Sequence, residues 1–268
     1  AVTLHSFHRC ELDITNEREL EERLSGLDVD VLINAAAYTQ VEKAEQEKDL
    51  AFKVNWNGAQ LAAQWACNNK CRFIHVSTDF VFDGKSNKSY CPDDATAPVN
   101  VYGASKLAGE QAVLQAHPQG AIIVRTGWLY SCHRSNFVTA MLELMSQRDH
   151  LGIVVDQLGT PTSAHSLADL IAQVVAGETQ SGVFHWSDAG VASWYDFAVA
   201  IQEEAIAAGL LDRTIPIEPI SSEQYPTAAA RPASSLLDKS TSYTAFGTAP
   251  IHWRKQLRVV IKELAINN

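Results

Sequence analysis

The chain has 268 residues, of which 46% are hydrophobic and 19% charged, so it can form one large domain with a smaller lobe and is not disordered throughout. Its 31 acidic residues outnumber the 21 basic ones and give a net charge of −10. Such a charge disfavours binding to nucleic-acid phosphates or anionic membranes, because like charges repel. We therefore expect neither partner. A small phosphorylated ligand would need only a local cluster of donors.

The cysteines are scattered and odd in number, five in all, which does not fit a disulfide framework. No second Cys or His pair follows Cys67 and Cys71 at zinc-finger spacing, so we expect no metal site. Reduced thiols are typical of a cytoplasmic protein. The sequence shows no signal peptide and no apolar run of membrane-spanning length, so we expect a cytoplasmic location without a membrane segment.

Short apolar runs alternate with helical patterns in the first 150 residues. In chain order, we expect a strand at residues 2–7, a helix at 17–24, a strand at 29–34, a loop of small residues at 35–39, a helix at 54–67, a strand at 72–77, a helix at 102–115 and a strand at 121–126. The β-branched run at 29–34 is typical of a strand buried on both faces. This alternation predicts βαβ units in a doubly wound parallel sheet, with ligands at the carboxyl ends of the strands.

Beyond about residue 150 the expected segments become shorter, and Gly and Pro become more frequent. We expect helices at 136–148 and 194–208 and short strands at 183–186 and 215–219. This pattern indicates a smaller α+β lobe at the edge of the sheet. Glu203 and Glu204 in the second helix are expected on a solvated face.

Three polar side chains come together where the strand at 72–77 ends and the next helix begins. Tyr102 and Lys106 are four residues apart and therefore share one face of a helix. A phenol titrates near ~10, and a nearby ammonium is expected to lower that pKa toward neutrality. The hydroxyl of Thr78, at the strand end, can hold a carbonyl oxygen. Together these groups can polarise a C=O bond and protonate its oxygen as hydride reaches its carbon. His75, inside the strand, is expected to be a core histidine.

Further motifs extend over nearly the whole chain: LDIT at 12–15, DVLINAAAYTQVEKAE at 30–45, Asn55, HVSTDFVFDG at 75–84, APVNVYGASKLAGE at 97–110, RTGWLYS at 125–131, NF at 136–137, DQLGTPT at 156–162, FHWS at 184–187 and ARP at 230–232. In this order they resemble the extended short-chain dehydrogenase/reductase superfamily and, within it, the dTDP-4-dehydrorhamnose reductase family. The resemblance implies a Rossmann-like fold. It makes residues 1–150 the dinucleotide-binding domain and residues 151–268 mainly the substrate-binding lobe, with room for segments that return to the sheet.

The resemblance also implies a role for each matching residue. Thr78, Tyr102 and Lys106 would be the catalytic set, with Tyr102 as proton donor and Lys106 also bonding the nicotinamide ribose. The other implied cofactor contacts are Asp13 and Ile14 beside the adenine, the small residues Ala35, Ala36 and Ala37 at a strand end, and Thr39 at the nicotinamide. The implied contacts to a dTDP-sugar substrate are Thr39, Thr78, Trp128, Asn136 and Arg231, the last at the diphosphate, where a guanidinium suits phosphate oxygens.

The chain departs from the family pattern at its start. None of its 14 glycines forms the GxxGxxG spacing of the family's glycine-rich turn. We therefore expect the first βα unit, on the order of 25 residues, to be missing from the sheet. Either the sequence is a trimmed part of a normal enzyme, or the protein is truncated and impaired in cofactor binding. The expected strand at 2–7 ends near His8 and Arg9 without an acidic residue for an NAD ribose, which favours NADPH over NADH.

The function implied by the resemblance is transfer of hydride from NADPH to the C4 ketone of dTDP-4-dehydro-L-rhamnose, which gives dTDP-L-rhamnose for cell-surface polysaccharide. The sequence does not decide whether the protein forms a homodimer. A second hypothesis is a non-catalytic binding subunit, similar to the regulatory β subunit of methionine adenosyltransferase. The motifs RTGWLYS, NF and DQLGTPT favour the reductase instead. A third, an epimerase or dehydratase of the same superfamily, is less favoured because Asp79 is followed by Phe80 rather than by a second acidic residue.

Overall fold

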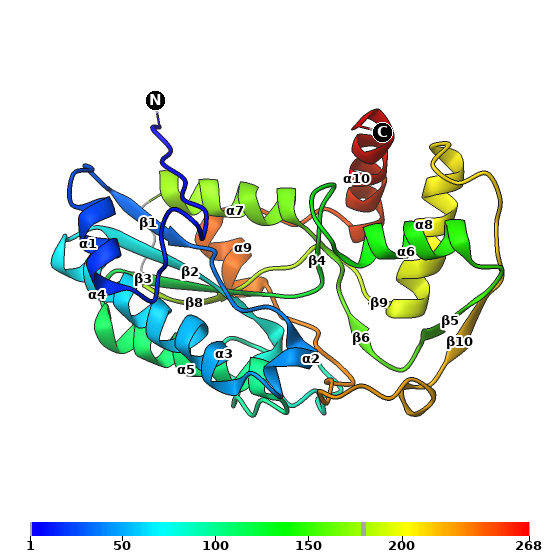
Figure 1. Ribbon diagram of the computed structural model, residues 1–268, viewed down its shortest axis with the longest axis horizontal. Helices are drawn as coiled ribbons and strands as arrows, with labels where there is room; N and C mark the ends of the chain where they lie inside the picture. The colour runs from blue at the N-terminus through cyan, green and yellow to red at the C-terminus, as the bar shows by residue number, and fades with distance from the viewer. Residues whose placement is uncertain (1, 178–180, 268) are drawn as a thin grey trace.

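A parallel four-stranded sheet organises the larger part of the molecule (Figure 1). The structure is a computed structural model that describes residues 2–177 and 181–267. The strands lie in the order β1 (Val31–Asn34), β2 (Arg72–Thr78), β3 (Ala121–Thr126) and β8 (Gly182–His185). Because each pairing is parallel, the carboxyl ends of these strands meet at one edge, where such sheets bind their ligands.

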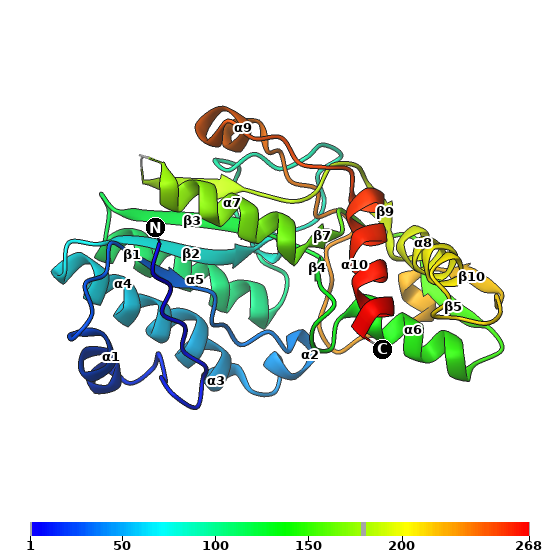
Figure 2. The same ribbon diagram turned by 90° about the horizontal axis from the view of Figure 1, so that it is seen from above.

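Helices cover both faces of this sheet (Figure 2). One face carries α1 (Glu17–Leu24), α4 (Ala59–Asn68) and α5 (Val101–Ala116), and the other carries α7 (Ala164–Ala176) and α9 (Ser240–Phe246). Successive residues of a strand point to opposite faces. Phe73 accordingly packs into the core beneath α1 and α4, and Ile74 packs into the core beneath α7. The prediction of a doubly wound parallel α/β sheet is confirmed.

The remaining elements form a smaller part beside the sheet (Figure 1). Its core is built on α6 (Phe137–Gln147), α8 (Trp194–Ala207), α10 (Trp253–Asn267) and the parallel pair of β5 (Leu151–Val154) and β10 (Ile217–Ile220). Two short pairs connect the parts, β4 (Leu129–Tyr130) with β7 (Thr162–Ser163) and β6 (Leu158–Gly159) with β9 (Ala192–Ser193). The short helices are α2 (Val41–Ala44), α3 (Lys48–Phe52), a π-helix at Lys53–Gly58 and 3₁₀ turns at Asp79–Val81 and Ser222–Gln224.

Most predicted elements form close to their expected bounds. The helix at 17–24 and the strand at 121–126 have the predicted bounds, as α1 and β3. The strand expected at 183–186 forms as β8 and pairs with β3, so the chain beyond residue 150 does return to the sheet.

Two expectations about the first strands are wrong. Residues 2–7 form no strand, and Val2 and Leu4 are 83% and 79% exposed. Within the described residues, β1 lies at the sheet edge with β2 as its neighbour, so the backbone of residues 2–7 joins no ladder. For the same reason β1 is not buried on both faces, and Ile33 is 37% exposed.

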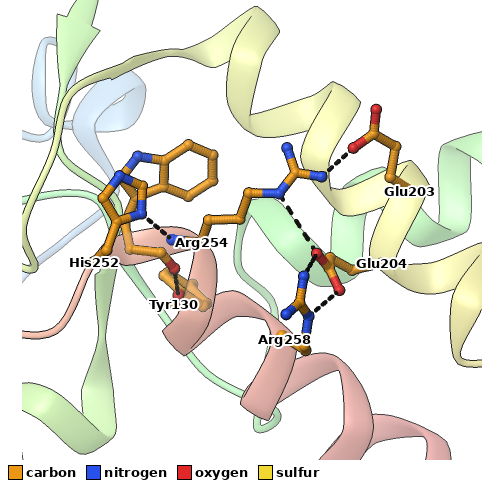
Figure 3. A network of polar contacts seen from close by, with 7 residues as sticks. Tyr130, Glu203, Glu204, His252, Arg254 and Arg258 are labelled. Carbon is orange, nitrogen blue, oxygen red and sulfur yellow. Dashed lines mark hydrogen bonds and ion pairs between the residues drawn. The ribbon is translucent and has the colours of Figure 1, made fainter.

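The expectation for Glu204 is also wrong, and Figure 3 shows why. Its side chain is only 8% exposed because α10 packs across α8, and both carboxylate oxygens accept 2.8 Å bonds from the guanidinium of Arg258. Arg254 lies 3.5 Å away and also pairs with Glu203, which stays more than half exposed. The two arginines lower the pKa of Glu204, so this pair of acidic residues joins two helices rather than facing solvent together.

The described residues include no helix that is both long and apolar enough to cross a bilayer. The cysteines, all within the described ranges, are free thiols, as their scatter in the sequence predicts.

Candidate active site

Thr78 ends β2 and begins a tight turn at the carboxyl edge of the sheet. Its hydroxyl accepts a 3.2 Å bond from the N–H of Phe80, which caps the 3₁₀ turn, and donates a 3.0 Å bond to Oδ1 of Asp79. Thr78 is only 5% exposed. The register places it opposite Thr126 at the end of β3. The hydroxyl therefore has a fixed position in a largely dry site.

The start of α5 is held directly against this turn. Asn100 caps the helix, because its Oδ1 accepts a 2.7 Å bond from the N–H of Gly103. A Cβ on Gly103 would lie 2.2 Å from the carbonyl oxygen of Phe80, so only glycine allows this approach. The close packing of α5 on the turn sets Tyr102 beside Thr78.

Tyr102 is half-buried, and its ring packs edge-on against Phe80 with ring centroids 5.7 Å apart. The phenol also contacts the hydroxyl of Thr78. Burial, with a smaller contribution from the charge of Asp79, raises the pKa of Tyr102 to about 12, and the neighbouring hydroxyl of Thr78 opposes this shift. The expected lowering of this pKa by Lys106 is wrong, because the ammonium is directed elsewhere.

Lys106 is 2% exposed and lies one turn after Tyr102 on α5. Its Nζ donates a 2.8 Å bond to the carbonyl oxygen of Val76 and lies 3.4 Å from Nε2 of His75. Burial lowers the pKa of Lys106 to about 8, although the carboxylate of Glu110 opposes this shift. The ammonium is thus close to losing its proton at neutral pH, which is unusual for a lysine.

His75 connects this lysine to the end of β1. The ring is fully buried, and burial together with the charge of Lys106 holds its pKa well below the ordinary value, so the imidazole is neutral. The N–H of Ala36 can only donate, and it bonds Oδ1 of Asn34 at 3.0 Å. Nδ2 of Asn34 therefore faces Nδ1 of His75, at 3.2 Å, as a donor. The single ring proton then belongs on Nε2, facing Lys106, and this arrangement disfavours the charged lysine.

The loop after β1 leaves its backbone accessible. Ala35 and Ala36 are exposed and Ala37 is half-buried, so only methyl groups cover this strand end. Asn55 fixes the loop: its Oδ1 accepts a 2.8 Å bond from the N–H of Tyr38, and its Nδ2 donates at 3.0 Å to the carbonyl oxygen of the same residue. A dinucleotide needs such a shallow, rigid strand end, and the three alanines fit that requirement.

The residues implied at the adenine lie in the segment before α1. Asp13 accepts bonds of 2.9 and 2.8 Å from the backbone and hydroxyl of Thr15, and these bonds, with smaller contributions from Lys53 and Arg9, lower its pKa. The side chain of Ile14 lies 2.8 Å from the position that a Cβ on Gly58 would take. Asp13 and Ile14 are therefore held between α1 and the π-helix.

Trp128 follows β3 and has a left-handed backbone, with φ of 51°. Its indole stacks face to face on Trp194 of α8, with ring centroids 3.5 Å apart and planes 4° apart. The preceding Gly127 touches the 3₁₀ turn after β2, because a Cβ there would lie 2.4 Å from Oδ2 of Asp79. The structure thus brings the Trp128 segment against the end of β2.

Asn136 and Arg231 already have protein partners. Asn136 caps α6, and its Nδ2 also donates a 2.9 Å bond to the carbonyl oxygen of Ser131, so it organises its own loop. Arg231 donates a 2.8 Å bond to Oε1 of Glu42 from α2. The Arg231 segment lies at the start of α5, because Nδ2 of Asn100 donates a 2.8 Å bond to the carbonyl oxygen of Ala230, the residue before Arg231.

Some contributing residues were given no catalytic or binding role from the sequence, although Asn55 belongs to a quoted motif, His75 was expected in the core and Asp79 was weighed against a dehydratase. They are Asn34, Glu42, Asn55, His75 and Asp79. Asn34, Asn55 and His75 are polar residues that are nearly fully buried. Asn34 and His75 lie within apolar strands, and a polar residue inside an apolar run was the sequence signal that could have identified them. Burial raises the pKa of Asp79 to about 6, and its Oδ2 has no hydrogen-bond partner among the described residues. The pairing of Glu42 with Arg231 spans 189 positions and has no local signal. Thr39 is exposed at the end of the alanine loop.

The chain was then compared with known proteins. Residues 1–266 match the family model of the RmlD substrate binding domain. A dTDP-4-dehydrorhamnose reductase of Aggregatibacter actinomycetemcomitans is 41% identical over 92% of this chain and 86% of its own length. One of Sinorhizobium fredii is 40% identical over 88% of this chain and 81% of its own length. The crystal structure of dTDP-4-dehydrorhamnose reductase from Bacillus anthracis in complex with NADP has 34% identity and a TM-score of 0.89 over 96% of this chain and 89% of that one. The chain therefore belongs to the dTDP-4-dehydrorhamnose reductase family, a family of NAD(P)H-dependent oxidoreductases.

Proposed function

We propose that this chain reduces the C4 ketone of dTDP-4-dehydro-L-rhamnose to dTDP-L-rhamnose with NADPH. The observation that carries the proposal is the close packing of the start of α5 on the turn at the carboxyl end of β2, which sets the phenol of Tyr102 beside the hydroxyl of Thr78. Family membership and the relative described in complex with NADP support the cofactor and the substrate class. NADPH, when bound, supplies the hydride.

The protonation states of the site support proton donation by Tyr102. With a pKa raised to about 12 by burial, the phenol keeps its proton at neutral pH. A protonated phenol is the form needed to donate to the alkoxide that develops on the ketone oxygen. The hydroxyl of Thr78 lies beside the phenol. By turning its single proton from Oδ1 of Asp79 to the substrate, it would hold the same oxygen in place, so that the proton of Tyr102 has a short path.

Lys106 would supply the positive charge of the site. As an ammonium it would stabilise negative charge that develops on the substrate oxygen. Because burial lowers its pKa to about 8, the charged form prevails at neutral pH and is lost above that value. We propose the same ammonium as the donor to the nicotinamide ribose.

The substrate would lie between the smaller part of the molecule and the proposed catalytic turn, which comprises Thr78 and the 3₁₀ turn at Asp79–Val81. Trp128 is fixed by its stack on Trp194 and by the close approach of Gly159 to its indole, so it would border the deoxysugar with a ring edge. Arg231 lies at the start of α5 with Nε buried and without a partner among the described residues. This arginine would meet the diphosphate, sharing its guanidinium with Glu42.

Arg9 supports the choice of NADPH over NADH. Its side chain is exposed and close enough to Asp13 to lower the pKa of that carboxyl. A guanidinium in this segment can accept a 2′-phosphate. Isothermal titration tests this directly. NADPH should bind with micromolar or tighter affinity. Weaker binding would support the impaired-cofactor alternative, and equal catalytic efficiency with NADH would overturn the preference.

A coupled assay tests the reaction. The dTDP-4-dehydro-6-deoxy sugar is generated in place, and the loss of NADPH absorbance is followed with and without this chain. Enzyme-dependent oxidation of NADPH with formation of dTDP-L-rhamnose is the expected result. If NADPH binds but no ketone is reduced, the catalytic proposal fails and a binding subunit becomes the better explanation. A stable complex with another enzyme in a pull-down would then be the next result to look for.

We also propose that the protein acts in the cytoplasm and forms a homodimer. Sedimentation equilibrium of the purified protein gives the second point directly. A homodimer has twice the 29.3 kDa mass of one chain. A single species at the mass of one chain would contradict it.

A further inference from the structure

A buried ion pair lies one helical turn beyond Lys106. Glu110 follows Lys106 by four residues on α5, so the two side chains share one face of the helix. The side chain of Glu110 is 2% exposed and pairs with Arg125 of β3, whose side chain is 6% exposed. Such a pair is often no more stabilising than apolar side chains of similar size, so stability alone is a weak explanation for it.

Both carboxylate oxygens of Glu110 are occupied as hydrogen-bond acceptors. Nε of Arg125 donates to them at 3.0 and 3.1 Å, and Nη2 donates to Oε2 at 2.8 Å. The hydroxyl of Ser77 donates to Oε1 as well. Because β2 and β3 are in register with Ser77 opposite Arg125, both donors come from neighbouring positions of the sheet. The carboxylate therefore has one fixed position between α5 and the sheet.

Arg125 is fixed in turn by groups that accept its remaining N–H bonds. Nη1 donates a 3.0 Å bond to the carbonyl oxygen of Pro92 and lies 3.4 Å from Nε2 of His185. Nδ1 of His185 lies 3.0 Å from the carbonyl oxygen of Tyr90, which can only accept, so the ring proton is on Nδ1 and Nε2 is an acceptor. Burial and the charge of Arg125 lower the pKa of His185 to about 3, so this ring is neutral. The guanidinium thus has no second cation beside it in the imidazole and stays directed at Glu110.

The environment of Lys106 contains groups that oppose its charge and one that favours it. The titratable and charged residues of β2, its following turn, β3 and α5 are Arg72, His75, Asp79, Tyr102, Glu110 and Arg125. Arg72 bonds the last carbonyls of α7 instead. Burial and the neutral ring of His75, whose Nε2 proton faces the ammonium, disfavour the charge, and the carboxylate of Glu110 raises the pKa of the lysine against them.

We propose that Glu110, fixed by Arg125, is a positioning residue that keeps Lys106 in its ammonium form for the proposed reduction, on which this inference rests. An opposite charge at about 4–6 Å favours the charged form of a neighbour. Because its oxygens are already occupied, the carboxylate takes no N–H group from the ammonium. Since Nε2 of His75 carries a proton, Nζ donates only to the carbonyl oxygen of Val76 among the described residues. The other N–H groups remain for the ribose and the substrate oxygen.

The titration of Lys106 can be measured on the full chain without substrate. Lysine labelled with ¹³C and ¹⁵N is incorporated, and the Cε signal of Lys106, assigned by its loss in Lys106→Met, is followed by NMR from about pH 6 to about pH 10. Glu110→Gln keeps the shape of the side chain and removes its charge, so the midpoint should fall by at least about one pH unit. Glu110→Asp keeps the charge and should lower the midpoint less. Lys239, whose pKa is also lowered by burial, is the internal control and should titrate as before.

Two further variants separate this role from a structural one. Glu204→Gln is the matched control, because Glu204 is also a buried carboxylate held by an arginine, in the smaller part of the molecule. It should leave the midpoint of Lys106 unchanged. Glu110→Gln combined with Arg125→Met leaves no unpaired charge buried and so protects the fold. The midpoint should still fall in this double variant, by less, because a positive charge is removed as well.

An unchanged or higher midpoint in Glu110→Gln or in the double variant, each verified as folded by circular dichroism, would overturn the proposal. An equal fall in Glu204→Gln would overturn it too, since it would reflect a general loosening of the structure. In the reductase assay, the decline of kcat/KM in Glu110→Gln should move to lower pH together with the midpoint. The expected titration without any ketone reduction would contradict the proposed function alone, whereas reduction with an unshifted midpoint would contradict this inference alone.

Discussion

The catalytic turn and the substrate-facing side of the site are built in different ways. Thr78 and Lys106 are almost completely buried, and each is positioned by its own secondary-structure element, β2 for Thr78 and α5 for Lys106. Arg231 and Trp128 are half-buried and depend on partners far along the chain, Glu42 and Trp194. The comparison teaches that local structure positions the residues proposed for proton chemistry, whereas contacts between the two parts of the molecule position those proposed for substrate recognition.

Replacing the proposed proton donor should have the largest effect. We expect Tyr102→Phe to lower kcat by ~10²–10⁴-fold, the range for a lost general acid, with little change in the affinity for NADPH. Tyr225→Phe, at a 59% exposed phenol, serves as the matched control and should turn over like the wild type. Wild-type turnover in Tyr102→Phe would show that the phenol is not the proton donor.

Breaking the indole stack should affect substrate binding more than chemistry. Trp194→Leu removes the surface against which Trp128 is held and should raise KM about tenfold, since an aromatic pair contributes roughly 0.5–1.5 kcal/mol beyond its buried area. kcat should change less than KM. A loss confined to kcat would place Trp128 with the catalytic groups instead, and steady-state kinetics separates the two outcomes.

The pH profile reports the state of Lys106. The pKa of Lys106 is lowered to about 8, and the proposed reaction needs its ammonium form. We therefore expect kcat/KM to be level below pH 8 and to decline above it, while Tyr102 stays protonated. In His75→Asn, an amide oxygen can accept from the ammonium, so the decline should move up by about one pH unit. A decline at the same or a lower pH in the variant would contradict the assignment of the ring proton to Nε2.

Releasing Arg231 from its carboxylate partner should have the smallest effect. Glu42→Gln removes the negative charge beside the guanidinium, so KM for the nucleotide sugar should fall by about fivefold, as expected for a partly exposed ion pair of about 1 kcal/mol. Glu22→Gln, in the ion pair on α1, is the control. A rise in KM would mean that Glu42 positions Arg231 rather than competing for it.

The same division explains how much the sequence could predict. The sheet, most of the helices and the trio of Thr78, Tyr102 and Lys106 follow from apolar periodicity and a four-residue spacing, which are local. The direction of the Tyr102 pKa shift could not be predicted from such local patterns, because it depends on the burial of the phenol and on the direction of the Lys106 side chain. The strand expected at residues 2–7 failed because pairing requires a neighbour, and a sequence pattern carries no information about neighbours.

Asn55 gives the molecule an internal linkage. Its amide reaches Tyr38 in the loop after β1 and donates a 2.9 Å bond to Ser105, whose hydroxyl in turn donates a 2.8 Å bond to the carbonyl oxygen of Tyr102. The alanine loop and the catalytic helix are therefore mechanically joined through one buried side chain. Movement of that loop on binding a ligand would be transmitted to the backbone of Tyr102, the proposed proton donor, so ligand occupancy at the loop and the alignment of Tyr102 would be coupled.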